Sequence, residues 1–219
     1  MSIESRFVET RSGVGSSRFA AARWHLKSAA VIAVISSTLA LTACTVPQAR
    51  YFVLSHVASQ NQVPSGVVKA VLGVGPISFP SHLDRSQLVL RTGPNELYLR
   101  ENDKWAEPLA ETTRRVLMQD LQDRLSPRRI EAFPWNSRDG VNWQITVDVA
   151  NFEAQPDRTV RLNAQWQIVD FTSGQIVMSN QFDQRIKPAS ADSADIVAAM
   201  SQLLGKLATE ISLAFSPHG

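Results

Sequence analysis

The chain has a single cysteine, Cys44, among its 219 residues, so it cannot form an internal disulfide or a cysteine-based metal cluster. Its four histidines are far apart and never show a His-x-x-His spacing, which leads us to predict no metal site. The G-x-S-x-G and S-x-x-K motifs of serine nucleophiles are also missing. Covalent catalysis therefore has no support in the sequence, and we predict no catalytic residues.

The apolar run at residues 29–41 is too short to cross a membrane as a helix, because a hydrocarbon core of about 30 Å requires ~20 residues. The run follows Arg18, Arg23 and Lys27 and leads into small residues. A basic region, a short apolar run and small residues, in that order, are typical of a cleaved secretory signal peptide. The sequence therefore predicts export.

The segment Leu41-Thr42-Ala43-Cys44 resembles the lipobox of bacterial lipoprotein precursors. The resemblance implies cleavage between Ala43 and Cys44, a diacylglycerol on the Cys44 thiol and an acyl chain on the new amine, with no other cofactor. Several acyl chains anchor a protein stably to a membrane. The alternative is a small buried cysteine that follows a core segment. We expect residues 1–43 to be the removed signal peptide, 44–66 to hold the lipidated cysteine, a tether and a short first strand, and 67–219 to form the domain.

The positive net charge of the whole chain, +2, comes from the predicted signal peptide. Residues 1–43 contain five basic and two acidic side chains, which leaves 17 basic and 18 acidic side chains in the 176 residues of the mature chain. The mature net charge is therefore about −1. This balance argues against nucleic acid as a partner.

Hydrophobic periodicity predicts one α+β domain. Residues 67–77 are apolar almost throughout, which indicates a strand covered on both faces, and Gly93-Pro94-Asn95 indicates a hairpin turn. Strands are expected at residues 51–54, 67–77, 88–92, 96–100, 143–149, 160–168 and 176–182, and helices from Pro108 to about Ser126 and from Asp192 to Phe215. We predict a mostly antiparallel sheet with two amphipathic helices packed on one face.

Two further motifs have structural interpretations. Gly73-Val74-Gly75 resembles part of a dinucleotide-binding fingerprint, but Pro76 follows and no helix begins there, so a close crossing of strands explains the glycines better. Asp120 and Asp123 are expected on the solvent side of the first helix, with an acid/base pair as the alternative.

Charged side chains gather around one tryptophan between residues 79 and 109. The candidate partner-binding residues are Asp84, Arg85, Arg91, Asn95, Trp105 and Glu107. The alternative is that Trp105 packs under the first helix and that the charges form an ordinary solvated face. Trp135 has the same two interpretations.

Short motifs follow the lipobox in a fixed order. They are Tyr51-Phe52-Val53-Leu54, Val74-Gly75-Pro76-Ile77, Leu83-Asp84-Arg85-Ser86-Gln87-Leu88-Val89, Arg91-Thr92-Gly93-Pro94-Asn95, Trp105-Ala106-Glu107-Pro108-Leu109, Arg115-Val116-Leu117 and Phe133-Pro134-Trp135. Together they resemble the ABC-type transport auxiliary lipoproteins of the PqiC/YmbA type across essentially the whole mature chain. Ser86 is a departure, because the family pattern usually has proline there.

The resemblance implies a non-enzymatic α+β lipoprotein of the periplasm that works in lipid transport between membranes. Its partners would be an MCE-domain protein (PqiB-like) or ABC transporter subunits. Assembly into a homo-oligomer is a further option that the sequence leaves open. Thr45 follows the lipidated cysteine in place of an aspartate that would favour the inner membrane, so we expect the outer membrane. Two alternatives stay open: an anchored envelope hydrolase that uses carboxylates, and a monomeric lipid carrier.

Overall fold

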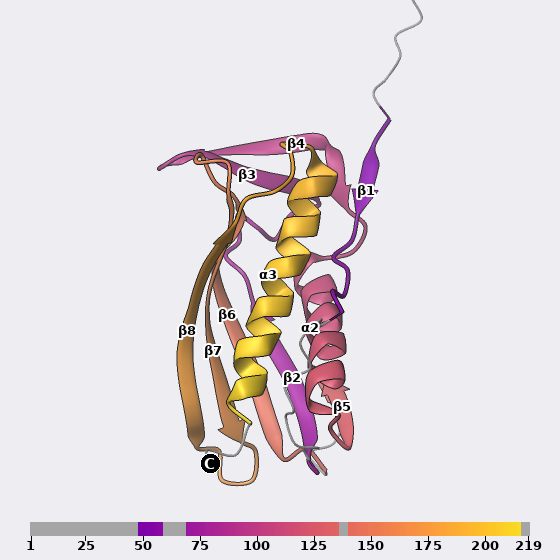
Figure 1. The fold of residues 1–219 in the computed structure, drawn as a ribbon, viewed down its shortest axis with the longest axis vertical. Helices are drawn as coiled ribbons and strands as arrows, with labels where there is room; N and C mark the ends of the chain where they lie inside the picture. The colour runs from indigo at the N-terminus through magenta and orange to yellow at the C-terminus, as the bar shows by residue number, and fades with distance from the viewer. Residues whose placement is uncertain (1–47, 59–68, 136–139, 216–219) are drawn as a thin grey trace, which may run out of the picture. The chain divides into compact units, whose positions relative to one another are not determined.

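The computed structural model describes residues 48–58, 69–135 and 140–215. Strands and helices follow one another along the chain as shown in Figure 1. The elements are β1 (Arg50–Phe52), β2 (Val71–Ser78), β3 (Gln87–Gly93), β4 (Glu96–Trp105), α2 (Leu109–Leu125), β5 (Arg129–Ala132), β6 (Trp143–Ala154), β7 (Val160–Asp170), β8 (Ile176–Ile186) and α3 (Ser193–Leu213). Their order, strands then helix then strands then helix, confirms the predicted α+β class.

The eight strands form one mixed sheet that curls around the helices. Strand order along its main path is β1-β4-β3-β6-β2-β5, and β7 and β8 continue the sheet from β6. The long ladders β6–β7 and β7–β8 and the β3–β4 hairpin are antiparallel, whereas β2 pairs parallel with both β5 and β6. Leu90 of β3 meets Ala154 at the end of β6, which joins the hairpin to the meander.

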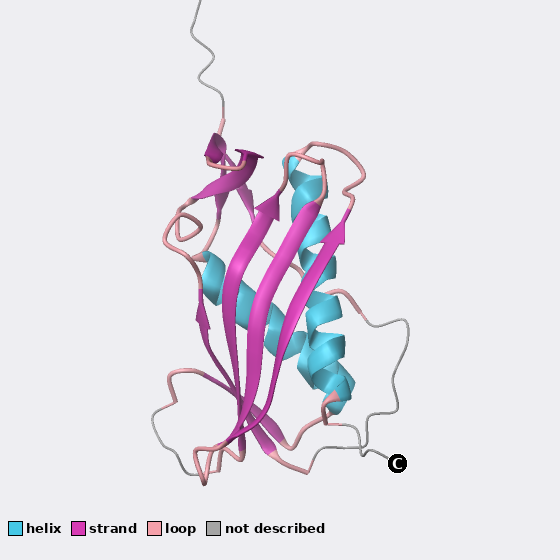
Figure 2. Cartoon of the chain, turned by 90° about the vertical axis from the view of Figure 1, so that its left-hand side faces the viewer, coloured by secondary structure: helices cyan, strands magenta, loops and turns pink. Residues whose placement is uncertain are grey.

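Both helices lie on the same side of the sheet, as predicted (Figure 2). α2 packs on β2 and β5, α3 packs on β6, β7 and β8, and the two helices contact each other. Trp166, Phe152 and Phe182 are the largest fully buried side chains. Each contributes on the order of 2–3 kcal/mol when it leaves water, so the layer between α3 and the meander holds the main hydrophobic core.

The ends of the helices follow local sequence signals. Asp192 caps α3 because its side chain accepts a hydrogen bond from the Ala194 N–H at 2.9 Å, as predicted. Pro108 directly precedes α2, and Ser126 ends it in the left-handed conformation with φ 41°. α3 is long and apolar enough to cross a membrane, but 67% of its apolar window is buried against the rest of the domain. Its composition is therefore explained by core packing.

The predicted close approach of another part of the chain to Gly73 is confirmed, but the neighbour is the ring of Trp135 and not a crossing strand. A Cβ atom at Gly73 would stand 2.7 Å from Cζ3 of Trp135, so only glycine leaves room for the indole. Trp135 also packs edge-on against Phe133 and Phe171. For Trp135 the packing interpretation is therefore the one that the structure supports.

Candidate functional site

The predicted lipidation and cleavage residues, Cys44 and Ala43, lie outside the described residues. The predicted partner-binding residues lie within them, on and beside the β3–β4 hairpin. They divide into two groups, because the hairpin places the residues before β3 and after β4 at one end and its turn at the other.

The first group surrounds a shallow hollow of about 290 Å³. Asp84, Arg85, Trp105 and Glu107 all line it. Asp84 and Arg85 are exposed, whereas Trp105 is only 6% exposed and belongs to the hydrophobic core. Trp105 therefore packs inside the domain, and little of its side chain is exposed in the hollow.

A salt bridge fixes the rim of this hollow. Arg115 of α2 donates to Oε1 of Glu107 at 2.7 Å, and this guanidinium lowers the pKa of the Glu107 carboxyl. The Ala106 N–H donates to the Phe52 carbonyl at 2.9 Å, so the hollow adjoins the end of β1. The rim thus presents charges of both signs next to β1, the first strand that the structure describes.

The second group lies at the other end of the hairpin. Arg91 donates to Oε1 of Glu153 at 3.0 Å and to the Pro94 carbonyl at 3.3 Å. Asn95 is exposed in the turn. Glu153 is fully buried and also accepts hydrogen bonds from Asn151 and from the Phe152 N–H. Arg91 therefore neutralises a buried carboxylate, a partner that sequence periodicity could not show.

A polar cluster that we did not predict joins three distant segments. Arg50 of β1 donates to both carboxylate oxygens of Asp103, at 2.7 and 2.9 Å, and to Asp192 at 3.0 Å. Arg100 and Ser193 also donate to Oδ2 of Asp103. The neighbouring Arg50 guanidinium lowers the pKa of Asp103 to about 2, and the Ser193 hydroxyl acts in the same direction. This cluster holds β1 to β4 and to the start of α3.

The expected position of Asp120 on the solvent side of its helix is wrong. Asp120 is fully buried, and His56 donates from Nδ1 to its Oδ1 at 2.5 Å. His56 Nε2 lies 2.8 Å from Asp123, which is half-exposed. No local pattern pairs His56 with Asp120, because 64 positions separate the two residues. The segment after β1 crosses α2 and covers the face that periodicity alone assigned to solvent.

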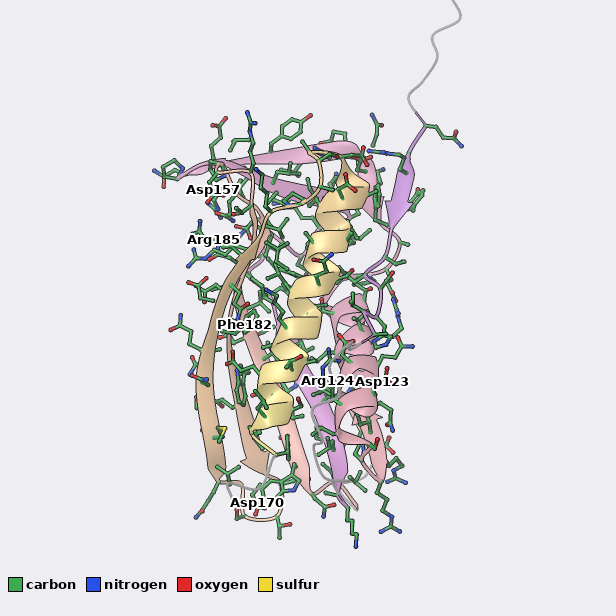
Figure 3. The ribbon with its side chains drawn as sticks, in the orientation of Figure 1. Asp123, Arg124, Asp157, Asp170, Phe182 and Arg185 are labelled. Atoms are coloured by element: carbon green, nitrogen blue, oxygen red, sulfur yellow. The ribbon has the colours of Figure 1, made fainter. Side chains whose placement is uncertain are left out.

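Arg124 completes this second cluster. It donates to the Asp120 carbonyl at 2.9 Å and to the Thr209 hydroxyl of α3 at 3.0 Å. Figure 3 shows Arg124 on the side of α2 that faces α3. Burial raises the pKa of Asp120, while His56 and Arg124 act against that rise. The cluster therefore ties α2, α3 and the segment after β1 together through one buried carboxylate.

No group of three or more His, Cys, Asp or Glu side chains within residues 48–58, 69–135 and 140–215 is placed to hold a metal ion. What the described residues do form is an α+β domain of two helices on a curled sheet, with a hollow of charged rim near β1.

The chain belongs to the family of ABC-type transport auxiliary lipoprotein components, whose model matches residues 52–212. It is thus an auxiliary lipoprotein component of an ABC-type transport system, and such lipoproteins are membrane-anchored proteins of the cell envelope. No curated protein matches the chain.

Solved structures share the fold at low sequence identity. An uncharacterised protein superimposes with a TM-score of 0.64 at 19% identity, covering 77% of this chain and 99% of its own. Protein XCC0632 from Xanthomonas campestris superimposes with a TM-score of 0.62 at 18% identity, covering 74% of this chain and 92% of its own. These similarities establish the fold.

Proposed function

We propose that this chain is the lipid-anchored, non-enzymatic docking subunit of an envelope lipid-transport system. In this proposal Cys44 carries the acyl chains, the domain stands on the periplasmic face of the outer membrane, and the hollow around Asp84, Arg85 and Glu107 receives an MCE-domain protein or an ABC transporter subunit. The family match over residues 52–212 supports the transport role.

The position of the hollow is the observation that carries the docking proposal. It adjoins the end of β1 through the Ala106–Phe52 hydrogen bond, and β1 begins at Arg50, six residues after Cys44. Six residues span at most about 20 Å, whatever conformation they adopt. A tether this short keeps the hollow near one leaflet and raises the effective concentration for a partner in the same envelope.

Charges of both signs around the hollow favour a polar partner surface of complementary pattern. Asp84 and Arg85 are exposed, and the Glu107–Arg115 pair fixes a second acid and base nearby. Rim charges of this kind act mainly on association rate and on specificity. Modest affinity suffices, since the anchor supplies proximity.

Photo-crosslinking in native membranes tests this proposal. A photoreactive amino acid at position 84 or 85 should crosslink the acylated protein to an MCE-domain protein or a transporter subunit, identified by mass spectrometry. The matched control is position 184, where exposed Gln184 lies on β8 away from the hollow. Equal crosslinking from position 184, or no such partner from positions 84 and 85, would contradict the docking site.

A charge reversal provides an independent measurement. Arg85→Glu should reduce the amount of partner recovered from membranes about three- to fivefold, because one rim charge contributes about 1 kcal/mol at an interface. Reversal of a remote exposed cation, Arg128→Glu, should leave recovery unchanged. A reduction of the same size in both variants would show that overall charge, not the hollow, governs association.

A further inference from the structure

A larger hollow of about 510 Å³ lies between β3, the β6–β7 turn and the segment that leads from β8 into α3. Its wall is mostly apolar. Leu90, Ala154, Pro156, Pro188 and Ile196 contribute to that wall. The volume lies within the range of small-molecule binding pockets, about 300–1,000 Å³. Its lining shares no residue with the hollow around Asp84, Arg85 and Glu107.

Basic side chains surround the apolar wall. The cations that line the hollow are Arg91, Arg100, Arg158 and Lys187. The first two are neutralised, Arg91 by Glu153 and Arg100 by Asp103. Arg158 and Lys187 are exposed, and neither makes an ion pair within the part of the chain that the structure describes. The hollow therefore has two positive charges that no described carboxylate neutralises.

The carboxylates on the surrounding segments already have partners. Asp157, in the β6–β7 turn, accepts from Arg185 at 2.7 Å and from the Thr159 hydroxyl at 2.6 Å. Figure 3 shows Asp157 and Arg185 at the same end of the sheet. Asp195 of α3 accepts from the Ser190 hydroxyl. An anionic group that entered the hollow would therefore meet Arg158 and Lys187 without having to displace an ion pair from either.

The segment between β8 and α3 is held in place from β4. Arg100 donates to the Ala191 carbonyl at 2.7 Å and to the Ser193 hydroxyl, and Arg50 reaches Asp192. These contacts fix one wall of the hollow before any ligand binds. They also place the hollow beside β1, because Arg50 is the first residue of that strand.

We propose that this hollow binds an anionic phospholipid from the leaflet in which the protein is anchored. The phosphate would contact Arg158, whose planar guanidinium can donate two parallel hydrogen bonds, and Lys187, a compact point charge. The glycerol and the first methylenes of an acyl chain would lie on the apolar wall. This inference rests on the proposed anchoring at Cys44, since the short chain from Cys44 to Arg50 keeps the hollow near the bilayer.

Photoactivatable lipids test the site in the acylated full-length mature protein. The protein is reconstituted in nanodiscs that contain either a diazirine-bearing phosphatidylglycerol or the matching phosphatidylcholine, and crosslinked peptides are identified by mass spectrometry. We expect adducts on the β6–β7 turn and on residues 187–191 with the anionic lipid. The zwitterionic lipid should give roughly fivefold fewer, because its headgroup has no net charge for the cations to attract.

Three variants separate the site from general electrostatic attraction. Arg158→Ala with Lys187→Ala should reduce the adducts by roughly fivefold for each charge removed. The matched control, Arg128→Ala with Lys206→Ala, removes two exposed cations elsewhere and should leave them unchanged. Ala189→Trp keeps both charges but fills the hollow, and it should also remove the adducts.

The outcomes that overturn the proposal are distinct from those that overturn the docking function. Equal adducts with both lipids, or adducts that survive Ala189→Trp, would contradict a lipid site in the hollow. Binding of inorganic phosphate by the protein, with no adducts from the anionic lipid, would assign the hollow to a free anion and also overturn it. Loss of partner crosslinks from positions 84 and 85 with the lipid adducts intact would overturn only the docking proposal.

Discussion

Asp103 shows how one residue joins parts of the chain that are distant in sequence. It accepts hydrogen bonds from Arg50, Arg100 and Ser193, which belong to β1, β4 and α3. Its side chain is almost fully buried, whereas that of Arg50 is about half-exposed. Water therefore partly screens the Arg50–Asp103 pair. Its contribution to the free energy of unfolding is that of a half-exposed salt bridge, to which the hydrogen bond from the buried Ser193 hydroxyl adds.

Removal of this carboxylate charge should weaken the fold in a pH-dependent way. Because the pKa of Asp103 falls from 3.8 to about 2 on folding, its contribution is fully present above pH 4 and is lost as the pH falls towards 2. We expect Asp103→Asn to lower the free energy of unfolding by about 1 kcal/mol at neutral pH, after allowance for screening, with a smaller difference at pH 2. Urea denaturation at both pH values measures this. A difference that grows towards pH 2 would contradict the assignment.

Gly73 is a second residue whose role is set by one neighbour. In Gly73→Ala the new methyl group would stand 2.7 Å from the Trp135 ring and 3.1 Å from Val141. We expect a loss of about 1–3 kcal/mol in the free energy of unfolding, because the indole must shift. Gly93→Ala is the control, since its methyl group would meet only Glu96 at 3.5 Å, and it should change stability by less than about 0.5 kcal/mol. Similar losses in both would argue against steric exclusion by Trp135.

Among the elements, α2 has neighbours on more than one face. It packs against β2 and α3, and the segment after β1 covers another part of its surface through His56. Sequence periodicity predicted the position of α2 and its C-terminal end well, because Leu117, Leu121 and Leu125 recur at helical spacing and are all fully buried. It could not predict burial of Asp120, because the covering segment lies more than 50 residues upstream.

The contact between His56 and α2 can be tested by comparing the loss of His56 with the loss of the Asp123 carboxylate charge. His56→Ala leaves the buried Asp120 without one of its partners, and we expect a loss of about 1–3 kcal/mol in the free energy of unfolding. Asp123→Asn alters only a half-exposed partner and should cost less than about 1 kcal/mol. Denaturation of both variants provides the comparison. A larger effect from Asp123→Asn would show that His56 interacts mainly with the exposed carboxylate.

The β3–β4 hairpin was also predicted from local sequence. The turn falls at Pro94 and Asn95 as expected, since those residues favour tight turns. Strand β4 continues to Trp105, beyond the predicted end at Arg100, because it gains a second neighbour in β1. The candidate partner-binding residues were expected to form one surface. They do not, because the length of the hairpin places Arg91 and Asn95 away from the hollow that Asp84 and Arg85 line.

At the scale of the whole molecule, the anchor and the domain are separate parts of the proposal. Cys44→Ser should lose acylation and membrane retention, because no thiol remains to carry the diacylglycerol. Circular dichroism and thermal melting of the released protein should match those of the acylated protein, since the described core does not include Cys44. An unchanged membrane fraction would contradict the anchor, and an unfolded product would contradict the separation of anchor and domain.

The fold class, the two helices, the hairpin, the Asp192 cap and the family could all be predicted from the amino-acid sequence. The helices, the hairpin and the cap depend on periodicity or turn chemistry within short segments, and the family depends on the order of short motifs along the chain. Which polar side chains meet depends on the tertiary structure. The pairs His56 with Asp120, Arg50 with Asp103 and Arg91 with Glu153 are 53 to 64 positions apart. Such contacts depend on how the strands pair and on which segment covers each face of a helix or of the sheet. No local sequence pattern encodes these arrangements.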